Sequence, residues 1–311
     1  MRYKAMIFLM ITAILLVSAC NGKTNEYEKD DKISVVASLF VQFDFAKKIV
    51  KEKGTVELLL PPGVETHTFE PTPRDLAKIQ EANVFVYTGG EMEPWVDKLL
   101  PGMTTDALKV VDASVNVKKE EIHDEAHAEE HGDEKVGEDP HIWLNPLNCL
   151  VMLDNILAAV CEVDPANAEF YRKNADKYKA EIRQLDEEIS EMIARSKKKT
   201  LVFGGKFAYG YFLQRYNLAW ETAYDGCSTE HEPDVKTVMS IIDFIHKNDI
   251  SYIYHEEMVE PKVANSIASE TGAECLTFST MHNISREQLD NGVGYIDIMR
   301  ENMQNIEKGL N

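Results

Sequence analysis

The feature that most constrains the fold is a long apolar stripe in the middle of the chain. Its members are spaced four and three residues apart: Tyr171, Ala175, Tyr178, Ile182, Leu185, Ile189 and Met192. This spacing forms one continuous face on a helix, and Asp164 followed by Pro165 is typical of a helix start. A helix over 165–196 would be roughly 48 Å long at about 1.5 Å per residue, which is long enough to run beside two lobes.

Short strand-like runs alternate with amphipathic helical patterns on both sides of this helix. In chain order the runs begin at Ile33, Thr55, Asn83 and Leu108 before the helix, and at Thr200, Ile250 and Cys275 after it. Such alternation is typical of parallel α/β units. The sequence therefore predicts an α/β fold of two lobes, each a parallel sheet flanked by helices, joined by one long rigid helix. Ligands of such proteins bind in the cleft between the lobes.

These patterns divide the chain into segments. We expect a lipoprotein signal peptide at 1–19, a flexible tether at 20–32, an N-terminal α/β lobe at 33–146 with an acidic histidine-rich loop at 118–138, connecting helices at 147–198 that include the long helix, and a C-terminal α/β lobe at 199–311.

The first twenty residues have the pattern of a secreted lipoprotein. Arg2 and Lys4 precede an apolar run that is too short to span a membrane, and we expect no later segment to be apolar for long enough. The ending "LVSAC" resembles a lipobox, although a plain secretory signal is the alternative. A lipobox would place an acyl anchor on Cys20, and the protein would then be extracytoplasmic and attached to the cell membrane.

Charge and cysteine content exclude several classes of protein. A formal net charge of -20 disfavours nucleic acid as a partner and favours cations. The remaining cysteines are too sparse for a disulfide scaffold or a CxxC zinc site. Cys149 and Cys161 lie in an apolar helical stretch, where we expect buried thiols. A bridge between Cys227 and Cys275 is left open by the sequence.

Three histidines stand where a rigid loop could hold a metal ligand. His67 follows a strand-like run and lies between Glu65 and Glu70. His141 lies in "EDPHIWLNP", a tight turn that could fix an imidazole in advance, and His282 follows the run "CLTF". Each is either a metal ligand or a surface, packing or turn residue.

Other histidines are less well placed. His231 lies in "EHEP" just before a helix that we expect to open at Pro233, and no capping duty explains it. His255 ends a strand-like run beside Glu256. His246 lies within an amphipathic helix, and we expect it to be a surface residue.

The acidic insertion contains His123, His127 and His131 at intervals of four residues. Gly132, Gly137 and the like charges disfavour a stable helix there. Imidazoles beside carboxylates can still collect zinc-like cations weakly. The segment is either an accessory metal-collecting loop or a solvated acidic loop.

Five segments in order, "GVETHTFEPTPRD", "DPHIWLNP", "FAYGYFLQRYNL", "EHEP" and "YIDIMRENM", resemble the zinc and manganese substrate-binding lipoproteins of ABC transporters, the high-affinity zinc uptake family. The resemblance covers roughly Ile33 to Asn311. It implies a two-lobed binding protein that captures a divalent metal ion, Zn²⁺ before Mn²⁺, and delivers it to an ABC transporter permease. It implies no enzymatic activity.

The resemblance also implies a ligand set, which this chain does not fully match. His67 and His141 correspond to the first two ligands. Lys206 stands at the third position, where a lysine ammonium cannot donate to a metal, and Ser279 stands at about the fourth, which is usually a carboxylate.

We therefore expect His231 and His282 to complete the site, with Glu256 as a weaker candidate. Four imidazole nitrogen ligands would favour zinc over manganese.

Three alternatives remain. A metal-dependent hydrolase could use His67 and His141, but no HExxH or GxSxG motif is present. A surface adhesin could use the metal only to stabilise its fold. Lys206 could also adapt the cleft to an anionic metal chelate. The sequence leaves open the ion, the permease and the extent of lobe closure.

Overall fold

A computed structural model describes residues 32–90, 92–103, 107–119, 139–224, 226 and 232–311. Within it, Ile33–Asn311 form one compact unit. The expectations for the signal peptide, Cys20, the histidine-rich insertion with His123, His127 and His131, Cys227 and His231 all lie outside the described residues.

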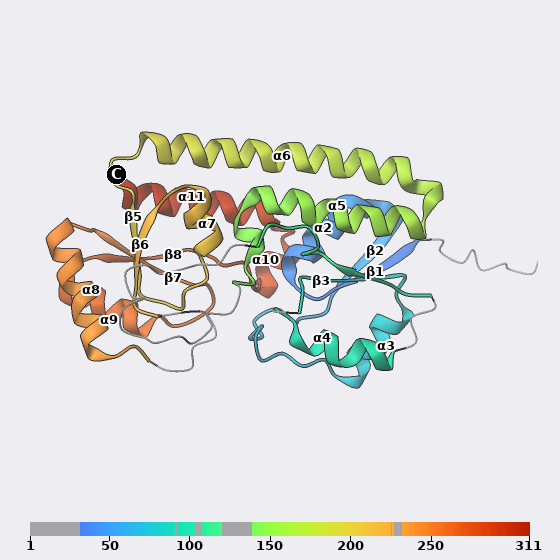
Figure 1. Ribbon diagram of the computed structural model, residues 1–311, viewed down its shortest axis with the longest axis horizontal. Coiled ribbons are helices and arrows are strands. Elements are labelled where there is room, and N and C mark those ends of the chain that lie inside the picture. The colour runs from blue at the N-terminus through green and yellow to red at the C-terminus, as the bar shows by residue number, and fades with distance from the viewer. Residues whose placement is uncertain (1–31, 91, 104–106, 120–138, 225, 227–231) are drawn as a thin grey trace, which may run out of the picture. The chain divides into compact units, whose positions relative to one another are not determined.

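The first sheet contains four parallel strands, β1 (Ile33–Ala37), β2 (Gly54–Leu58), β3 (Val84–Tyr87) and β4 (Lys109–Asp112), in the order β2-β1-β3-β4. Alternate side chains of β1 and β3 point to opposite faces. Val36 and Phe85 pack with α3 (Pro73–Glu81) and α4 (Pro94–Leu99). Val35 and Val86 pack on the other face, with residues of α2 (Phe40–Val50) and α5 (Pro146–Val163). Figure 1 shows α2 and α5 on one side of this sheet, and α3 and α4 on the other.

The second sheet repeats this plan with β5 (Thr200–Phe203), β6 (Ala219–Thr222), β7 (Tyr252–His255) and β8 (Glu274–Thr277) in the order β6-β5-β7-β8. One face is covered by α8 (Val235–Asn248) and α9 (Lys262–Thr271), and the other by α7 (Gly210–Arg215) and α11 (Tyr295–Leu310). The sequence reading missed β6, a four-residue edge strand with one buried residue. Helix α8 begins at Val235, because the carboxylate of Asp234 caps the amide of Thr237 at 2.7 Å.

The long helix is observed, with a short 3-10 turn before it. The turn covers Pro165–Asn167, and α6 continues from Ala168 to Arg195 for 28 residues. The predicted apolar stripe is buried along its whole length. The sequence predicts that Asp164 caps the helix, but its side chain does not do so. Its carboxylate instead accepts hydrogen bonds from Asn167 (2.8 Å) and Tyr171 (2.5 Å).

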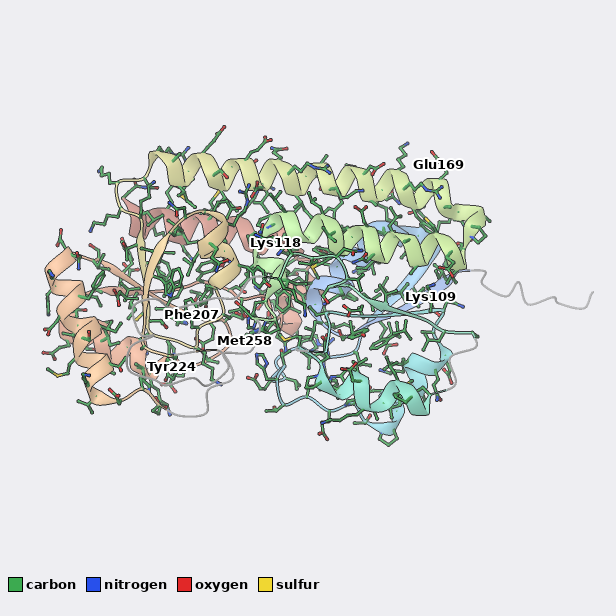
Figure 2. The ribbon with its side chains drawn as sticks, viewed as in Figure 1. Lys109, Lys118, Glu169, Phe207, Tyr224 and Met258 are labelled. Carbon is green, nitrogen blue, oxygen red and sulfur yellow. The ribbon has the colours of Figure 1, made fainter. Side chains whose placement is uncertain are left out.

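Helix α6 runs alongside α5, α2 and α11, and thus contacts helices that cover both sheets (Figure 1). Side chains fill the space between it and the sheets (Figure 2), where one large apolar cluster spans both lobes. The predicted fold class, two parallel-sheet lobes joined by one long helix, is confirmed. The exact segment boundaries stay predictions.

By length and composition alone, helix α5 could cross a membrane. This differs from the expectation that no segment after the N-terminal one is apolar for long enough. Eight of its residues are buried and it packs against α6, so its apolar character is explained by the core. Cys149 on this helix is buried as expected, whereas Cys161 is half-buried. Cys275 has a free thiol with respect to the described residues, which do not include Cys227. His246 is exposed on α8 as expected.

Candidate metal centre

Three histidines from distant parts of the sequence converge. His67 lies in the loop after β2, His141 lies directly before the 3-10 turn Ile142–Leu144, and His282 follows β8. Each offers one ring nitrogen, and these nitrogen atoms all lie within 4.8 Å of one another. The ring centroids of His141 and His282 are 4.5 Å apart, and those of His67 and His282 are 5.1 Å apart. His67 and His282 lie in loops after the carboxyl ends of strands, where the fold predicts ligand sites.

His141 is held by its own turn. Only 1% of the residue is exposed. The Asp139 carboxylate accepts the backbone N–H of His141 at 2.9 Å, and the same oxygen contacts the ring Nδ1. A carboxylate at Nδ1 favours the proton on that nitrogen and leaves the Nε2 lone pair for a metal.

His282 has the same kind of arrangement through a hydroxyl. Its Nδ1 lies 2.9 Å from Thr280 Oγ1. Its Nε2 is buried and has no hydrogen-bond partner in the part of the chain that the structure describes. Burial lowers the pKa of His282 well below its usual value, and His141, His67 and Lys206 lower it further. A neutral imidazole is the form that binds metals.

The loop that carries His67 is fastened to the residue next to His282. Asn283 donates from its side-chain amide to the carbonyl oxygens of Val64 (2.5 Å) and Pro61 (3.3 Å). Glu65 accepts the backbone N–H of His67 at 3.3 Å. The two lobes therefore meet through hydrogen bonds beside the histidines, and not only through the long helix.

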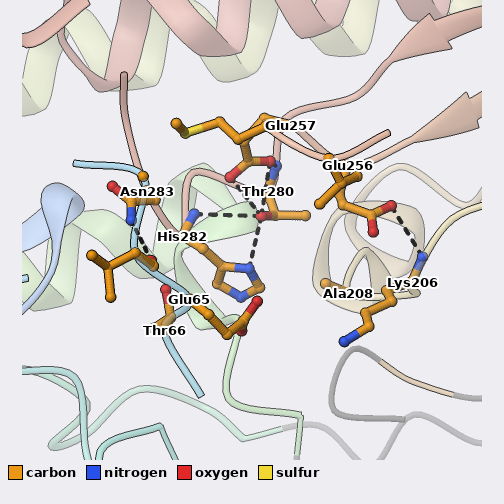
Figure 3. Close-up of a pocket in the computed structure, with 13 residues that line it drawn as sticks. Glu65, Thr66, Lys206, Ala208, Glu256, Glu257, Thr280, His282 and Asn283 are labelled. Carbon is orange, nitrogen blue, oxygen red and sulfur yellow. Dashed lines mark hydrogen bonds between the residues drawn. The ribbon is translucent and has the colours of Figure 1, made fainter. Parts of the chain in front are cut away.

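Lys206 and Ser279 do not join the group of ring nitrogens. Lys206 lines the same cavity as His282 (Figure 3), and its backbone N–H donates to Glu256 Oε2 at 3.1 Å. A Cβ at Gly205 would lie 1.9 Å from that carboxylate oxygen, so this approach requires glycine. Ser279 is bound through its backbone N–H and carbonyl to the amide of Asn302, both at 2.8 Å.

The two glutamates after β7 have different partners. Glu256, the weaker candidate from the sequence, lies outside the three-histidine group and supports the backbone at Lys206. Sequence reasoning gave no role to Glu257. Its carboxylate accepts the N–H of Thr280 at 2.7 Å and contacts the Thr280 hydroxyl at 3.0 and 3.1 Å. Burial raises the pKa of both glutamates. The only signal for Glu257 was its place in the acidic pair "HEEM" at a strand exit.

A cavity of about 180 Å³ adjoins His282 (Figure 3). Its polar lining includes Glu65, Lys206, Glu256, Glu257 and Thr280. Three imidazole nitrogen ligands suit zinc, which takes four ligands in a tetrahedron. No fourth histidine, cysteine or carboxylate joins the three nitrogen atoms within the described ranges, and His231 lies outside them.

Comparison with protein families and curated proteins gives matches over nearly the whole chain. Residues 35–309 match the family described as zinc-uptake complex component A, periplasmic. The chain is 34% identical over 310 residues to the high-affinity zinc uptake system protein ZnuA of Bacillus subtilis, covering 98% of this chain and 97% of that protein. It is 28% identical over 313 residues to the zinc-binding lipoprotein AdcA of Streptococcus pneumoniae, where it spans 99% of its own length and 61% of AdcA.

Solved structures share the fold. The metal-dependent lipoprotein YcdH from Bacillus subtilis has a TM-score of 0.78 at 33% identity, covering 90% of this chain and 100% of that one. The Zn(II)-bound ZnuA-like domain of Streptococcus pneumoniae AdcA has a TM-score of 0.75 at 26% identity, covering 90% and 99%. The laminin binding protein Lmb of Streptococcus agalactiae, described as bifunctional with adhesin and metal transporting activity, has a TM-score of 0.75 at 27% identity, covering 90% and 100%.

Proposed function

Because the chain belongs to the family of zinc-uptake complex component A, we propose that it is the extracytoplasmic solute-binding component of a metal ABC importer. It captures Zn²⁺ between its lobes and delivers the ion to a membrane permease. The Zn(II)-bound relative of the same fold supports this choice of ion.

The observation that supports the proposal most is the convergence of His67, His141 and His282. Two of these rings have an oxygen partner at Nδ1, so their Nε2 atoms are the natural ligand atoms. Nitrogen ligands favour zinc over manganese, which prefers oxygen. We assign the three histidines as zinc ligands. His231 as a fourth ligand, and His123, His127 and His131 as a collecting loop, stay predictions from the sequence.

We further propose that Cys20 carries a lipid anchor. The lipobox-like ending of the N-terminal apolar segment supports it, and a curated relative is called a lipoprotein. An anchor would keep the protein at the membrane surface near its permease. Mass spectrometry of the protein from membranes would detect the acyl chains, and a Cys20→Ala variant should be released into the soluble fraction.

Isothermal titration with Zn²⁺ tests the metal site. His67→Ala, His141→Ala and His282→Ala should each weaken binding by roughly 100-fold or more, because the loss of a ligand exceeds the 10- to 100-fold effect of losing a residue that only orients one. His246→Ala is the matched control, since His246 is exposed on α8. Wild-type affinity in all three variants would refute the assignment.

An adhesin role is the second candidate, because Lmb shares the fold and is described as both adhesin and transporter. In that case the metal would serve mainly to stabilise the fold. Binding of immobilised laminin by zinc-loaded and chelator-treated protein would favour adhesion. A zinc uptake defect after gene deletion, with no laminin binding, would favour transport alone.

A further inference from the structure

We propose that Glu257 and Thr280 form a hydrogen-bonded chain that fixes the orientation and tautomer of His282. Both act as positioning residues, since neither is a member of the metal-binding group. The inference deepens the proposed function and rests on it, because it concerns how a zinc ligand is prepared. Its hydrogen bonds can nevertheless be measured without zinc.

The chain is assembled by the pairing of two strands. Strands β7 and β8 are parallel neighbours, and His255 at the end of β7 pairs with Thr277 at the end of β8. The loops that follow therefore start side by side. Glu257 lies two residues beyond β7 and Thr280 three residues beyond β8, and the carboxylate reaches the hydroxyl directly (Figure 3).

The positions of the protons follow from the partners. The Thr280 hydroxyl has one proton. Its oxygen, Oγ1, lies 3.0 and 3.1 Å from the two carboxylate oxygens of Glu257. The Glu257 carboxylate also accepts the Thr280 backbone N–H at 2.7 Å. In its ionised form this carboxylate only accepts hydrogen bonds, so the hydroxyl donates to Glu257. The hydroxyl oxygen then accepts from His282, through the ring Nδ1 at 2.9 Å and the backbone N–H at 3.4 Å. His282 is thereby held as the Nδ1–H tautomer.

The other end of the imidazole supports the same assignment. Nε2 of His282 is buried and has no acceptor among the residues that the structure describes. A proton on that nitrogen would be a buried, unsatisfied donor, which costs about 1–3 kcal/mol. A lone pair there points to a metal, because His67 and His141 offer their nitrogen atoms within 4.8 Å.

A single substitution should reverse the donor and acceptor roles along this series of hydrogen bonds. In Glu257→Gln the carboxamide can accept the Thr280 backbone N–H with its oxygen and donate to the Thr280 hydroxyl with its nitrogen. The hydroxyl would then donate to His282 Nδ1, and the proton of the ring would move to Nε2. This tautomer has no lone pair for a metal at Nε2. Thr280→Val removes the hydroxyl and leaves the ring without either preference.

The test is ¹⁵N NMR of histidine side chains in chelator-treated protein, with His282 assigned by comparison with His282→Ala. We expect the Nδ1–H tautomer in the wild type and in Thr280→Ser, the Nε2–H tautomer in Glu257→Gln, and a mixture in Thr280→Val. Zinc affinity should fall by about 10- to 100-fold in Glu257→Gln and Thr280→Val, and Thr280→Ser should restore it. Glu260→Gln, an exposed carboxylate on the same loop, is the control.

An Nε2–H tautomer in the wild type, or unchanged tautomer and affinity in both Glu257→Gln and Thr280→Val, would overturn the chain. Failure of the proposed function gives a different result. The wild type would then show the Nδ1–H tautomer and yet bind no zinc.

Discussion

The two lobes hold their histidines by different means. In the first lobe, the oxygen at His141 Nδ1 comes from Asp139, two residues earlier in the same turn. In the second lobe, the oxygen at His282 Nδ1 comes from Thr280, which is bound to Glu257, 23 residues away on the loop after another strand. The local support depends on one turn, whereas the distant support needs the parallel pairing of β7 with β8. The complete site therefore requires both a short motif and a folded sheet.

The largest predicted effect is on the pH dependence of stability. It concerns Glu93, a buried carboxylate in the first lobe, as Glu257 is in the second. It accepts hydrogen bonds from Thr88, Gly89 and Ser38, and burial raises its pKa to about 7. Because the folded-state pKa exceeds the unfolded value, its contribution to stability is complete below about pH 4.5 and is lost as the pH rises to about 7. The change is about 3 kcal/mol.

Chemical denaturation between pH 4.5 and 7.5 would measure this change. In Glu93→Gln the pH dependence should become flatter, while the exposed control Glu52→Gln should keep the wild-type curve. Equal curves for wild type and Glu93→Gln would show that Glu93 does not titrate in this window.

Removing the local support should weaken zinc binding next most strongly. Asp139→Ala deletes the oxygen at His141 Nδ1, so we expect zinc affinity to fall by roughly 10- to 100-fold. Isothermal titration would compare it with Thr280→Val, and Asp243→Ala on the surface of α8 is the control. An unchanged affinity in Asp139→Ala alone would mean that only the distant support matters.

Removing the hydrogen bonds that link the two lobes should have a smaller effect, and this effect is on the free energy of unfolding. Asn283→Ala removes the amide that donates to Val64 and Pro61. Because the loss leaves carbonyl groups without this partner, we expect the free energy of unfolding to fall by about 1–2 kcal/mol. Asn265→Ala on the exposed side of α9 should change it by less than about 0.5 kcal/mol. Equal stabilities for the two variants would contradict the role of Asn283.

The smallest predicted effect concerns Lys206. Its positive charge lines the cavity beside His282 and opposes a bound cation. Lys206→Met should therefore tighten zinc binding by about five- to tenfold, which corresponds to about 1 kcal/mol of relieved repulsion. Lys262→Met, at an exposed position, should leave the affinity unchanged. Weaker binding in Lys206→Met would indicate that the lysine holds an anion that accompanies the metal.

The sequence predicted the features that depend on local patterns. The stripe of α6, seven of the eight strands and the turn around His141 all follow from spacing and turn chemistry. Strand β6 was missed because its four residues carry little apolar alternation. Glu257 could not be paired with Thr280, because their contact depends on the register of β7 against β8, and register between distant strands is not written in either segment alone.

A crystal structure of the zinc-loaded protein, with the ion located by anomalous scattering at the zinc edge, tests the central claim most directly. We predict one ion bound by His67, His141 and His282 at about 2.0–2.1 Å, through Nε2 of His141 and His282, with Glu257, Thr280 and His282 still hydrogen-bonded in a chain. An ion bound elsewhere, or bound through Nδ1 of His282 with Thr280 displaced, would contradict the account.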